Sequence, residues 1–291
     1  MKQKVEYENQ KPVVKIENNR VIKRYKNATI EYNVNKILQE YTDESWGIPE
    51  IVNNSSNQIT MKICDGLPIR WRRVTIEYLL EKMEETGSLL ARLHCIKDAR
   101  MDKVIKQQNV ALHDYVLNKF SDYLNNFGGI FLNTDYKNKI KIGFLDSIKK
   151  INLHSNYGFV HGDFCYQNLL FGKKSNYVID FENSHIGYQV DDLSRFSSKI
   201  ILLGIEIPNL PVDILEKKFL KSYSSIIPFD HLTYEHLKFA YLLNIKKPLE
   251  ISNFNPLAVL NKSNNRRRYK KLINFRYCKI YRKISNSSSI S

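Results

Sequence analysis

The first part of the chain places short runs of β-branched and aromatic residues between polar turn residues, which is the pattern of β-strands. Glu17-Asn18-Asn19 separates the first two runs and predicts a hairpin turn. From Ile30 to Tyr41, apolar residues instead recur every three or four positions, which predicts an amphipathic helix. The strands expected here are Val13–Ile16, Arg20–Tyr25, Glu50–Val52 and Gln58–Cys64.

From Thr75 onward most of the chain follows a helical period. Leu169–Phe171 and Tyr177–Asp180, on either side of a turn, predict a short hairpin within this part. This order predicts an α+β fold with two domains, a small antiparallel sheet lobe at residues 1–64 and a larger, mainly helical lobe at residues 65–291. The expected helices are residues 76–93, 110–126, 136–151 and, with interruptions at prolines, 191 to about 281.

Composition excludes several classes of protein. With 43% hydrophobic and 26% charged residues, the chain has the composition of a folded protein and not of a disordered one. No run approaches the roughly 18 apolar residues of a membrane-spanning helix, and the charges within Met1–Gln10 do not match a signal peptide. The four cysteines are too scattered to predict a zinc site or a disulfide framework. We therefore expect a cytoplasmic protein with no membrane span.

The positive charge of the chain is unevenly distributed. Residues 201–291 contribute an excess of 10 to the formal net charge of +15, and Arg266–Lys283 is the densest part, which we call the basic segment. Such charge favours an acidic surface or an anionic ligand as a partner. Nucleic acid is not favoured, because no nucleic-acid-binding fold is recognised around the segment, and a solvated helix face is the simpler interpretation.

Two short motifs indicate the chemistry: His161–Asn168 is HGDFCYQN and Val178–Glu182 is VIDFE. Phosphoryl transfer of the kinase type needs one carboxylate that accepts a hydroxyl proton. It also needs an amide and a second carboxylate that hold Mg²⁺ on the nucleotide phosphates. Asp163, Asn168 and Asp180 provide this set in this order, and hard oxygen ligands suit Mg²⁺. An H-G-D triplet alone is a common turn, so the prediction rests on the combination.

Together with Thr86–His94 (TGSLLARLH), these motifs resemble the aminoglycoside phosphotransferase and choline kinase superfamily, from about Val13 to Asp192. Around Tyr166-Gln167-Asn168 the sequence also resembles the spore-coat kinase-like branch. The resemblance implies a two-lobed protein-kinase-like fold. It also implies an ATP- and Mg²⁺-dependent enzyme that moves the γ-phosphate to a hydroxyl of a small molecule or an envelope saccharide.

The resemblance also implies roles for individual residues. Asp163 is the expected catalytic base, and Asn168 and Asp180 are the expected Mg²⁺ ligands. His161 is expected to hold the loop around Asp163 by hydrogen bonds to its backbone, since Asp163 already supplies the base.

The nucleotide site implied by the resemblance centres on a strand lysine that contacts the α and β phosphates and on its glutamate partner. Lys15 and Arg24 compete with Lys23 for the first role, and Glu40 competes with Glu31 for the second. The backbone of Met61–Asp65 falls where the family's hinge contacts the adenine. The cofactor-binding residues implied are Lys23, Glu31, Met61, Ile63, Asn168 and Asp180.

The chain departs from the family before Lys23, because residues 8–12 and 17–20 contain no glycine and therefore no Gly-rich phosphate loop. This leaves a second class of function open, a catalytically weak or inactive kinase-like scaffold, for example in spore coat assembly and located in the spore coat. The basic final third also disfavours polycationic aminoglycosides as acceptors, since a site for them needs carboxylates. We expect neutral or anionic acceptors to be preferred.

Overall fold

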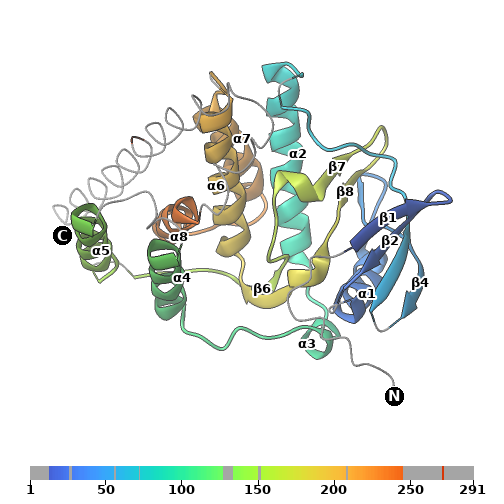
Figure 1. Ribbon diagram of the computed structural model, residues 1–291, viewed down its shortest axis with the longest axis horizontal. Helices are drawn as coiled ribbons and strands as arrows, with labels where there is room; N and C mark the ends of the chain where they lie inside the picture. The colour runs from blue at the N-terminus through green and yellow to red at the C-terminus, as the bar shows by residue number, and fades with distance from the viewer. Residues whose placement is uncertain are drawn as a thin grey trace. The chain divides into compact units, whose positions relative to one another are not determined.

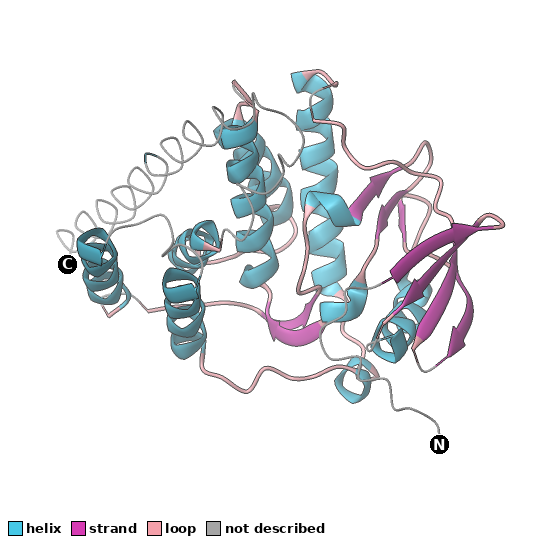
Figure 2. Cartoon of the chain, in the orientation of Figure 1, coloured by secondary structure: helices cyan, strands magenta, loops and turns pink. Residues whose placement is uncertain are grey.

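A computed structural model gives the fold of the chain (Figures 1 and 2). It describes residues 13–25, 28–55, 57–71, 73–126, 134–149, 152–207, 209–244 and 271. The basic segment, apart from Lys271, lies outside the described residues, and so does the end of the last expected helix.

The chain divides into two compact units. The first contains Met1–Trp71, Arg92–Gln108 and Gly158–Gly187, and the second contains Arg72–Ala91, Asn109–Tyr157 and Tyr188–Ser291. The first unit therefore joins the N-terminal strands to the segment that carries both motifs. The two domains expected from the sequence, divided between residues 64 and 65, remain a prediction.

A four-stranded antiparallel sheet forms one part of the first unit, with the strand order β1-β2-β5-β4. Asn18 and Asn19 have φ angles of 48° and 59°, and this left-handed backbone makes the tight turn between the first two strands. The hairpin expected at this point is confirmed. The strands are β1 (Val13–Glu17), β2 (Arg20–Arg24), β4 (Ile51–Ser55) and β5 (Gln58–Lys62).

Helix α1 (Ala28–Leu38) contacts β4 and β5 and buries Val34 and Leu38 completely. It begins two residues before the expected start, and a short 3₁₀ helix, η1 (Gln39–Tyr41), follows it. The strand β3 (Trp46–Gly47) lies where the sequence predicts only the end of the helix. A two-residue strand is too short to show a period, so the pattern could not indicate it.

The segment with both motifs folds into short elements that complete the first unit. The expected hairpin is present as β7 and β8, and β3 pairs with β8 in parallel, giving a sheet with the order β3-β8-β7. The strand β9 pairs with β6 and was not expected. The elements are β6 (Tyr157–Val160), η3 (Tyr166–Asn168), β7 (Leu169–Phe171), β8 (Asn176–Val178), η4 (Phe181–Asn183) and β9 (His185–Tyr188).

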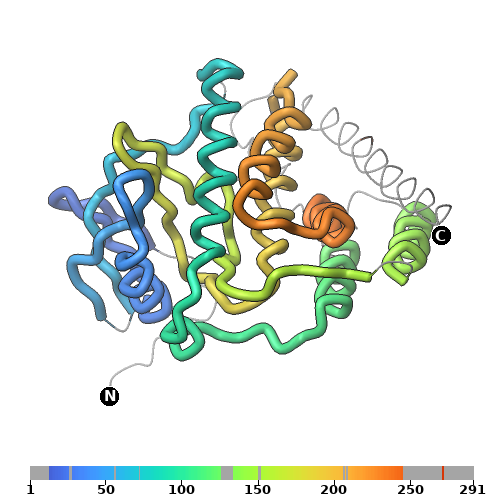
Figure 3. The backbone as a smooth tube through the Cα atoms, turned by 180° about the vertical axis from the view of Figure 1, so that it is seen from behind, coloured from blue at the N-terminus to red at the C-terminus, as the bar shows by residue number. Residues whose placement is uncertain are grey.

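The second unit is helical, as the period of its apolar residues predicts. Helix α8 contacts α6 and α4, and α6 and α8 lie side by side in Figures 1 and 3. The Phe120 and Phe144 rings stack with their centroids 3.8 Å apart in this core. The helices of this unit are α4 (Leu112–Asn126), α5 (Thr134–Ile148), α6 (Val190–Glu206), α7 (Val212–Ser224) and α8 (His231–Leu243).

Helix α2 (Ile76–Cys95) begins in the second unit and ends in the first, where the short helix α3 (Met101–Val104) follows it. Within the described ranges, no helix is both long enough and apolar enough to cross a membrane. Small antiparallel sheets and a larger number of helices make the fold α+β, which confirms the fold class expected from the sequence.

Candidate active site

Lys23 lies at the centre of a buried group of charges. It is on β2, opposite Ile59 of β5, and is only 7% exposed. Its Nζ is 2.9 Å from Glu31 Oε2, contacts Asp180 Oδ1 and is 3.3 Å from Glu182 Oε2. We call Lys23, Glu31, Asp180 and Glu182 the carboxylate cluster. The structure thus brings together three of the residues expected to bind the nucleotide.

The competing residues do not join this cluster. Lys15 is exposed and pairs with Glu17 of its own strand, while exposed Arg24 donates to Gln58 Oε1 at 2.7 Å. Glu40 is also exposed and pairs with Arg100. Of the alternatives that the sequence left open, only Lys23 and Glu31 form a buried ion pair.

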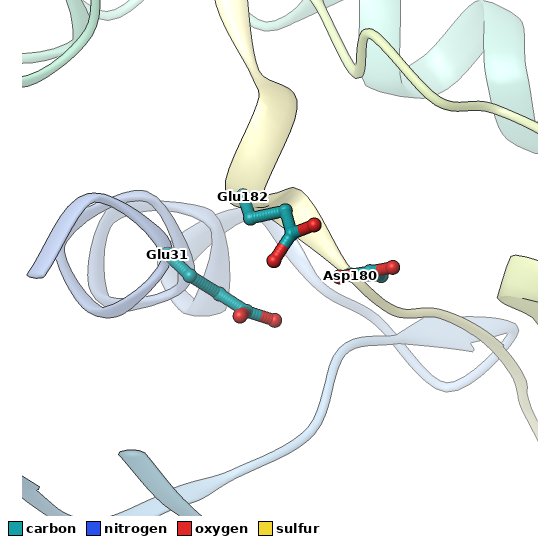
Figure 4. Close-up of side chains that lie close together, drawn as sticks. All are labelled: Glu31, Asp180 and Glu182. Atoms are coloured by element: carbon teal, nitrogen blue, oxygen red, sulfur yellow. The ribbon is translucent and has the colours of Figure 1, made fainter. Parts of the chain in front are cut away.

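Packing of two distant segments creates the cluster. Glu31 is in the first turn of α1, whereas Asp180 and Glu182 lie at the start of η4, and α1 contacts η4. Figure 4 shows the three carboxyl groups pointing toward one another from these elements. The Tyr25 hydroxyl also donates to Glu31 Oε2, so the buried glutamate has two donors.

Asp180 has an unusual backbone conformation, with a φ of 72° in the left-handed region. Such a conformation costs free energy for any residue other than glycine, and Asp tolerates it better than most. It turns the chain sharply between β8 and η4, at the point where Asp180 and Glu182 reach Lys23. A strained position that the surrounding structure retains is a common mark of a functional site.

Burial and charge act against each other in the carboxylate cluster. Burial alone would lower the pKa of Lys23, but the Glu31 and Asp180 carboxylates outweigh it and raise that pKa above its usual value. Burial raises the pKa of Glu31, and the Lys23 charge only partly offsets this. The pKa of Glu182 is raised for the same reasons. One ammonium group therefore balances three carboxyl groups only in part.

The donor set of this cluster fits a hard divalent cation. Ligand oxygens of Glu31, Asp180 and Glu182 all lie within 4.8 Å of one another. Glu182 Oε2 is buried and accepts no hydrogen bond from the described residues, although Lys23 lies 3.3 Å from it. Carboxylate oxygens in excess of the local positive charge are the ligands that Mg²⁺ prefers.

The loop of the first motif is held together by its own side chains. Asn168 Nδ2 donates to Asp163 O at 2.9 Å and approaches Asp163 Oδ2 at 3.4 Å. The amide of Ile179, directly before Asp180, donates to Asn168 O at 3.0 Å. Asp163 and Asn168 are therefore in contact, and the Asn168 backbone is tied to the residue before Asp180.

His161 is fully buried and bonds the loop as the sequence predicts. Its Nε2 lies 3.0 Å from Ile179 O, and the Asp163 amide donates to its Nδ1 at 3.3 Å. These partners fit a neutral ring with the proton on Nε2. Gly162, between them, has a φ of 79°, and a Cβ there would lie 2.1 Å from Asn183 O, so only glycine fits.

Two of the expected cofactor-binding residues stand apart from these contacts. Met61 is buried in β5 opposite Val21, and Ile63, which follows the strand, is 43% exposed. Their expected role depends on backbone atoms, which leave no side-chain signature. Glu182 is a further member of the site that the motifs do not predict, although it is visible in the sequence as a second acid two positions after Asp180.

Comparison with known proteins assigns the chain to a family. The model of the phosphotransferase enzyme family matches residues 48–201, which is more than half of the 291 residues, and the chain belongs to this family. By family it is a kinase-type phosphotransferase, which confirms the resemblance seen in the sequence. The spore-coat branch remains a prediction. No curated protein sequence matches this chain.

Solved structures share the fold at low sequence identity. An aminoglycoside phosphotransferase, APH(2'')-Ib with ADP bound, is 17% identical with a TM-score of 0.54, over 85% of each chain. A choline/ethanolamine kinase family protein from Mesorhizobium loti is 14% identical with a TM-score of 0.54, over 92% of this chain and 88% of that one. A macrolide 2'-phosphotransferase from Brachybacterium faecium is 12% identical with a TM-score of 0.55, over 87% and 82%.

Proposed function

We propose that this phosphotransferase uses ATP and Mg²⁺ to phosphorylate a hydroxyl of a small molecule or an envelope saccharide. The observation that carries the proposal is the carboxylate cluster, in which buried Lys23 joins Glu31 of α1 to Asp180 of the second motif. A similar fold has been solved with ADP bound, and another in a ternary complex with streptomycin and ATP, which supports ATP as the phosphate donor.

In this proposal, the oxygen of the acceptor hydroxyl bonds to the γ-phosphorus and ADP leaves. Asp163 accepts the proton that the hydroxyl gives up. Asn168 and His161 hold the Asp163 loop in place, through the contacts at 2.9 and 3.3 Å. Lys23, fixed by Glu31, donates to the phosphates. Asn168 and Asp180 would hold Mg²⁺, with Glu182 as an added carboxylate, and a bound Mg²⁺ neutralises charge on the phosphate oxygens.

Thermal unfolding with and without Mg-ATP tests the proposal. A ligand at a hundred times its dissociation constant adds about 2.7 kcal/mol to the free energy of unfolding. We expect Asp180→Ala to lose this stabilisation, whereas Asp163→Asn keeps it and lowers phosphate transfer by about a hundredfold or more. Asp102→Asn, at an exposed position of α3, is the matched control. A wild-type protein that Mg-ATP does not stabilise contradicts the proposal.

The second candidate is a catalytically weak or inactive scaffold, for example in spore coat assembly. It is favoured by the hairpin of β1 and β2, whose turn residues Asn18 and Asn19 provide no glycine for a phosphate loop. In this proposal the basic segment docks on an acidic surface. ADP release across a panel of amino alcohols, sugars, nucleosides and aminoglycosides separates the two candidates. The scaffold predicts no acceptor-dependent release, and the enzyme predicts release that favours neutral or anionic acceptors.

A further inference from the structure

Trp71 presents a hydrogen-bond donor that has no acceptor. The side chain is only 9% exposed, and its Nε1 is buried without a hydrogen-bond partner in the part of the chain that the structure describes. An indole N–H can only donate, so an acceptor oxygen must approach it if the donor is to be satisfied. Buried polar groups without partners are rare, and each one points to a missing water, ion or ligand.

The backbone places Trp71 beside the loop that carries the expected base. Leu67 forms an antiparallel bridge with Phe171, with hydrogen bonds of 3.1 and 2.9 Å in the two directions. Because the two segments run in opposite directions, the chain after Leu67 moves back along β7 toward η3. The ring of Trp71 accordingly meets Tyr166 of η3 edge to face, with centroids 5.3 Å apart.

We propose that the Trp71 indole N–H donates a hydrogen bond to a ribose hydroxyl of the bound nucleotide. This inference rests on the proposed function, in which Asn168 would hold Mg²⁺ at the phosphates, and on the family resemblance, which implies that the Met61–Asp65 backbone contacts the adenine. Trp71 follows that segment by six residues and contacts the turn that ends at Asn168. The ribose is the part of a nucleotide that lies between its base and its phosphates.

Because Trp71 Nε1 is buried, side chains around it must shift for a ribose hydroxyl to reach it. Half-buried Tyr166, whose ring contacts the Trp71 ring, is one of these neighbours. Arg70 and Arg73, on either side, are exposed and form no ion pair with a described residue. They add positive charge to the segment that carries Trp71, which suits a polyphosphate ligand.

A thermodynamic cycle between one side chain and one ligand group tests the proposal. Trp71→Phe keeps an aromatic ring and removes the N–H, and dideoxy-ATP keeps the base and phosphates and lacks both ribose hydroxyls. We expect Trp71→Phe to weaken Mg-ATP binding about threefold to tenfold, the range for one hydrogen bond. For Mg-dideoxy-ATP, the wild type and the variant should bind equally. Equal weakening of both nucleotides, or no weakening of either, overturns the proposal.

The only other tryptophan, Trp46, provides the matched control. It is also buried, in β3, and its indole nitrogen is not among the unpartnered atoms of the described residues. Trp46→Phe should leave the affinity for Mg-ATP unchanged. In that variant the remaining fluorescence comes from Trp71, and we expect Mg-ATP to change it, whereas fluorescence of Trp71→Phe should stay constant.

Failure of this inference can be told apart from failure of the proposed function. If Trp71→Phe does not fold, the wild type still tests the proposal, because it should bind dideoxy-ATP more weakly than ATP. In Trp46→Phe, Trp71 fluorescence should also respond differently to the two nucleotides. A wild type that binds both nucleotides equally overturns the ribose assignment alone. A wild type that binds no Mg-nucleotide overturns both proposals.

Discussion

Each unit of the molecule contains buried charges, and two of the buried groups, one from each unit, are balanced in opposite ways. In the first unit, the carboxylate cluster surrounds one lysine with three carboxyl groups. The group from the second unit has Asp191 as its one acid, and Lys119 and Arg195 lie near it. Two tyrosine hydroxyls, from Tyr115 and Tyr241, donate to Asp191 Oδ1 at 2.6 Å each.

We call this second group the tyrosine–aspartate cluster: Tyr115, Lys119, Asp191, Arg195 and Tyr241. Lys119 and Arg195 donate to the Tyr241 hydroxyl at 3.1 and 3.2 Å, and each cation also lies over its ring. Its members come from α4, α6 and α8, which pack together. The cluster carries no excess of negative charge and ties three helices to one another, which is the arrangement of a structural network.

The contrast indicates what each group of charges does. In a network that stabilises the fold, cations and hydroxyl donors of the protein offset the charge of the buried carboxylate. A site for a cation keeps more carboxylate than its own cations neutralise, as the carboxylate cluster does. Variants in the tyrosine–aspartate cluster should therefore change folding stability most, and variants in the carboxylate cluster should change binding most.

Asp191→Asn should have the largest effect on folding. Asp191 is 1% exposed, and its loss leaves two cations without a carboxylate among the tyrosines. Breaking a buried pair in this way costs about 3–5 kcal/mol. Urea denaturation measures the loss, with Asp122→Asn, at an exposed position of α4, as the control. A loss of less than about 1 kcal/mol would show that the tyrosine–aspartate cluster is not structural.

Lys23→Met should destabilise the fold less, by roughly 2 kcal/mol, while it abolishes Mg-ATP stabilisation. The variant leaves Glu31 buried without its cation, but the pKa of Glu31 is already raised by burial, so it can take up a proton and avoid the full cost. Adding Glu31→Gln should restore stability without restoring nucleotide binding. If the double variant binds Mg-ATP like the wild type, Lys23 is not a phosphate ligand.

Alkaline pH should weaken the tyrosine–aspartate cluster. Burial and the Asp191 carboxylate raise the pKa of Tyr115, and burial raises the pKa of Tyr241, with Arg195 offsetting part of this effect. Above about pH 10, these tyrosines lose protons in the unfolded chain and keep them in the folded one. Each then removes about 1.4 kcal/mol of stability per pH unit as the pH rises, and has no effect at lower pH.

Stability curves measured above pH 10 check this prediction, with tyrosinate absorbance as a second readout. Tyr241→Phe removes one of the tyrosines with a raised pKa, so its stability should fall less steeply with pH than that of the wild type. Parallel curves for the variant and the wild type would mean that Tyr241 ionises normally in the folded protein.

Sequence alone could predict the chemistry because the motif residues are close together along the chain. Asp163 and Asn168 share one loop, and Asn168 bonds to Asp163, which lies only five positions earlier. The helices and the main hairpins follow from hydrophobic period in the same way. The two-residue strand β3 could not be predicted, because its pairing with β8 depends on residues about 130 positions away.

The choice between competing charges also needed the structure. Lys15, Lys23 and Arg24 all lie on a β-hairpin, and alternation shows which residues share a face but not which face is covered. Lys23 is buried because α1 and η4 close over it, and these elements are about 150 residues apart in sequence. The sequence shows Glu182 as a second acid after Asp180, but only this packing brings it near Glu31.

Glu182→Gln should have the smallest effect on folding and separates the two clusters most sharply. Glu182 is one of three carboxyl groups around a single lysine, so removing its charge relieves repulsion and should leave the free energy of unfolding within about 0.5 kcal/mol. Mg-ATP affinity should fall about tenfold, because a carboxylate near the expected Mg²⁺ ligands is lost.

Glu77→Gln, at an exposed position of α2, is the control and should change neither quantity. Titration of both variants with Mg-ATP, at fixed pH and salt, measures the difference. If Glu182→Gln binds Mg-ATP as tightly as the control, the excess of carboxylate in the first unit does not serve a cation, and the contrast with the tyrosine–aspartate cluster no longer holds.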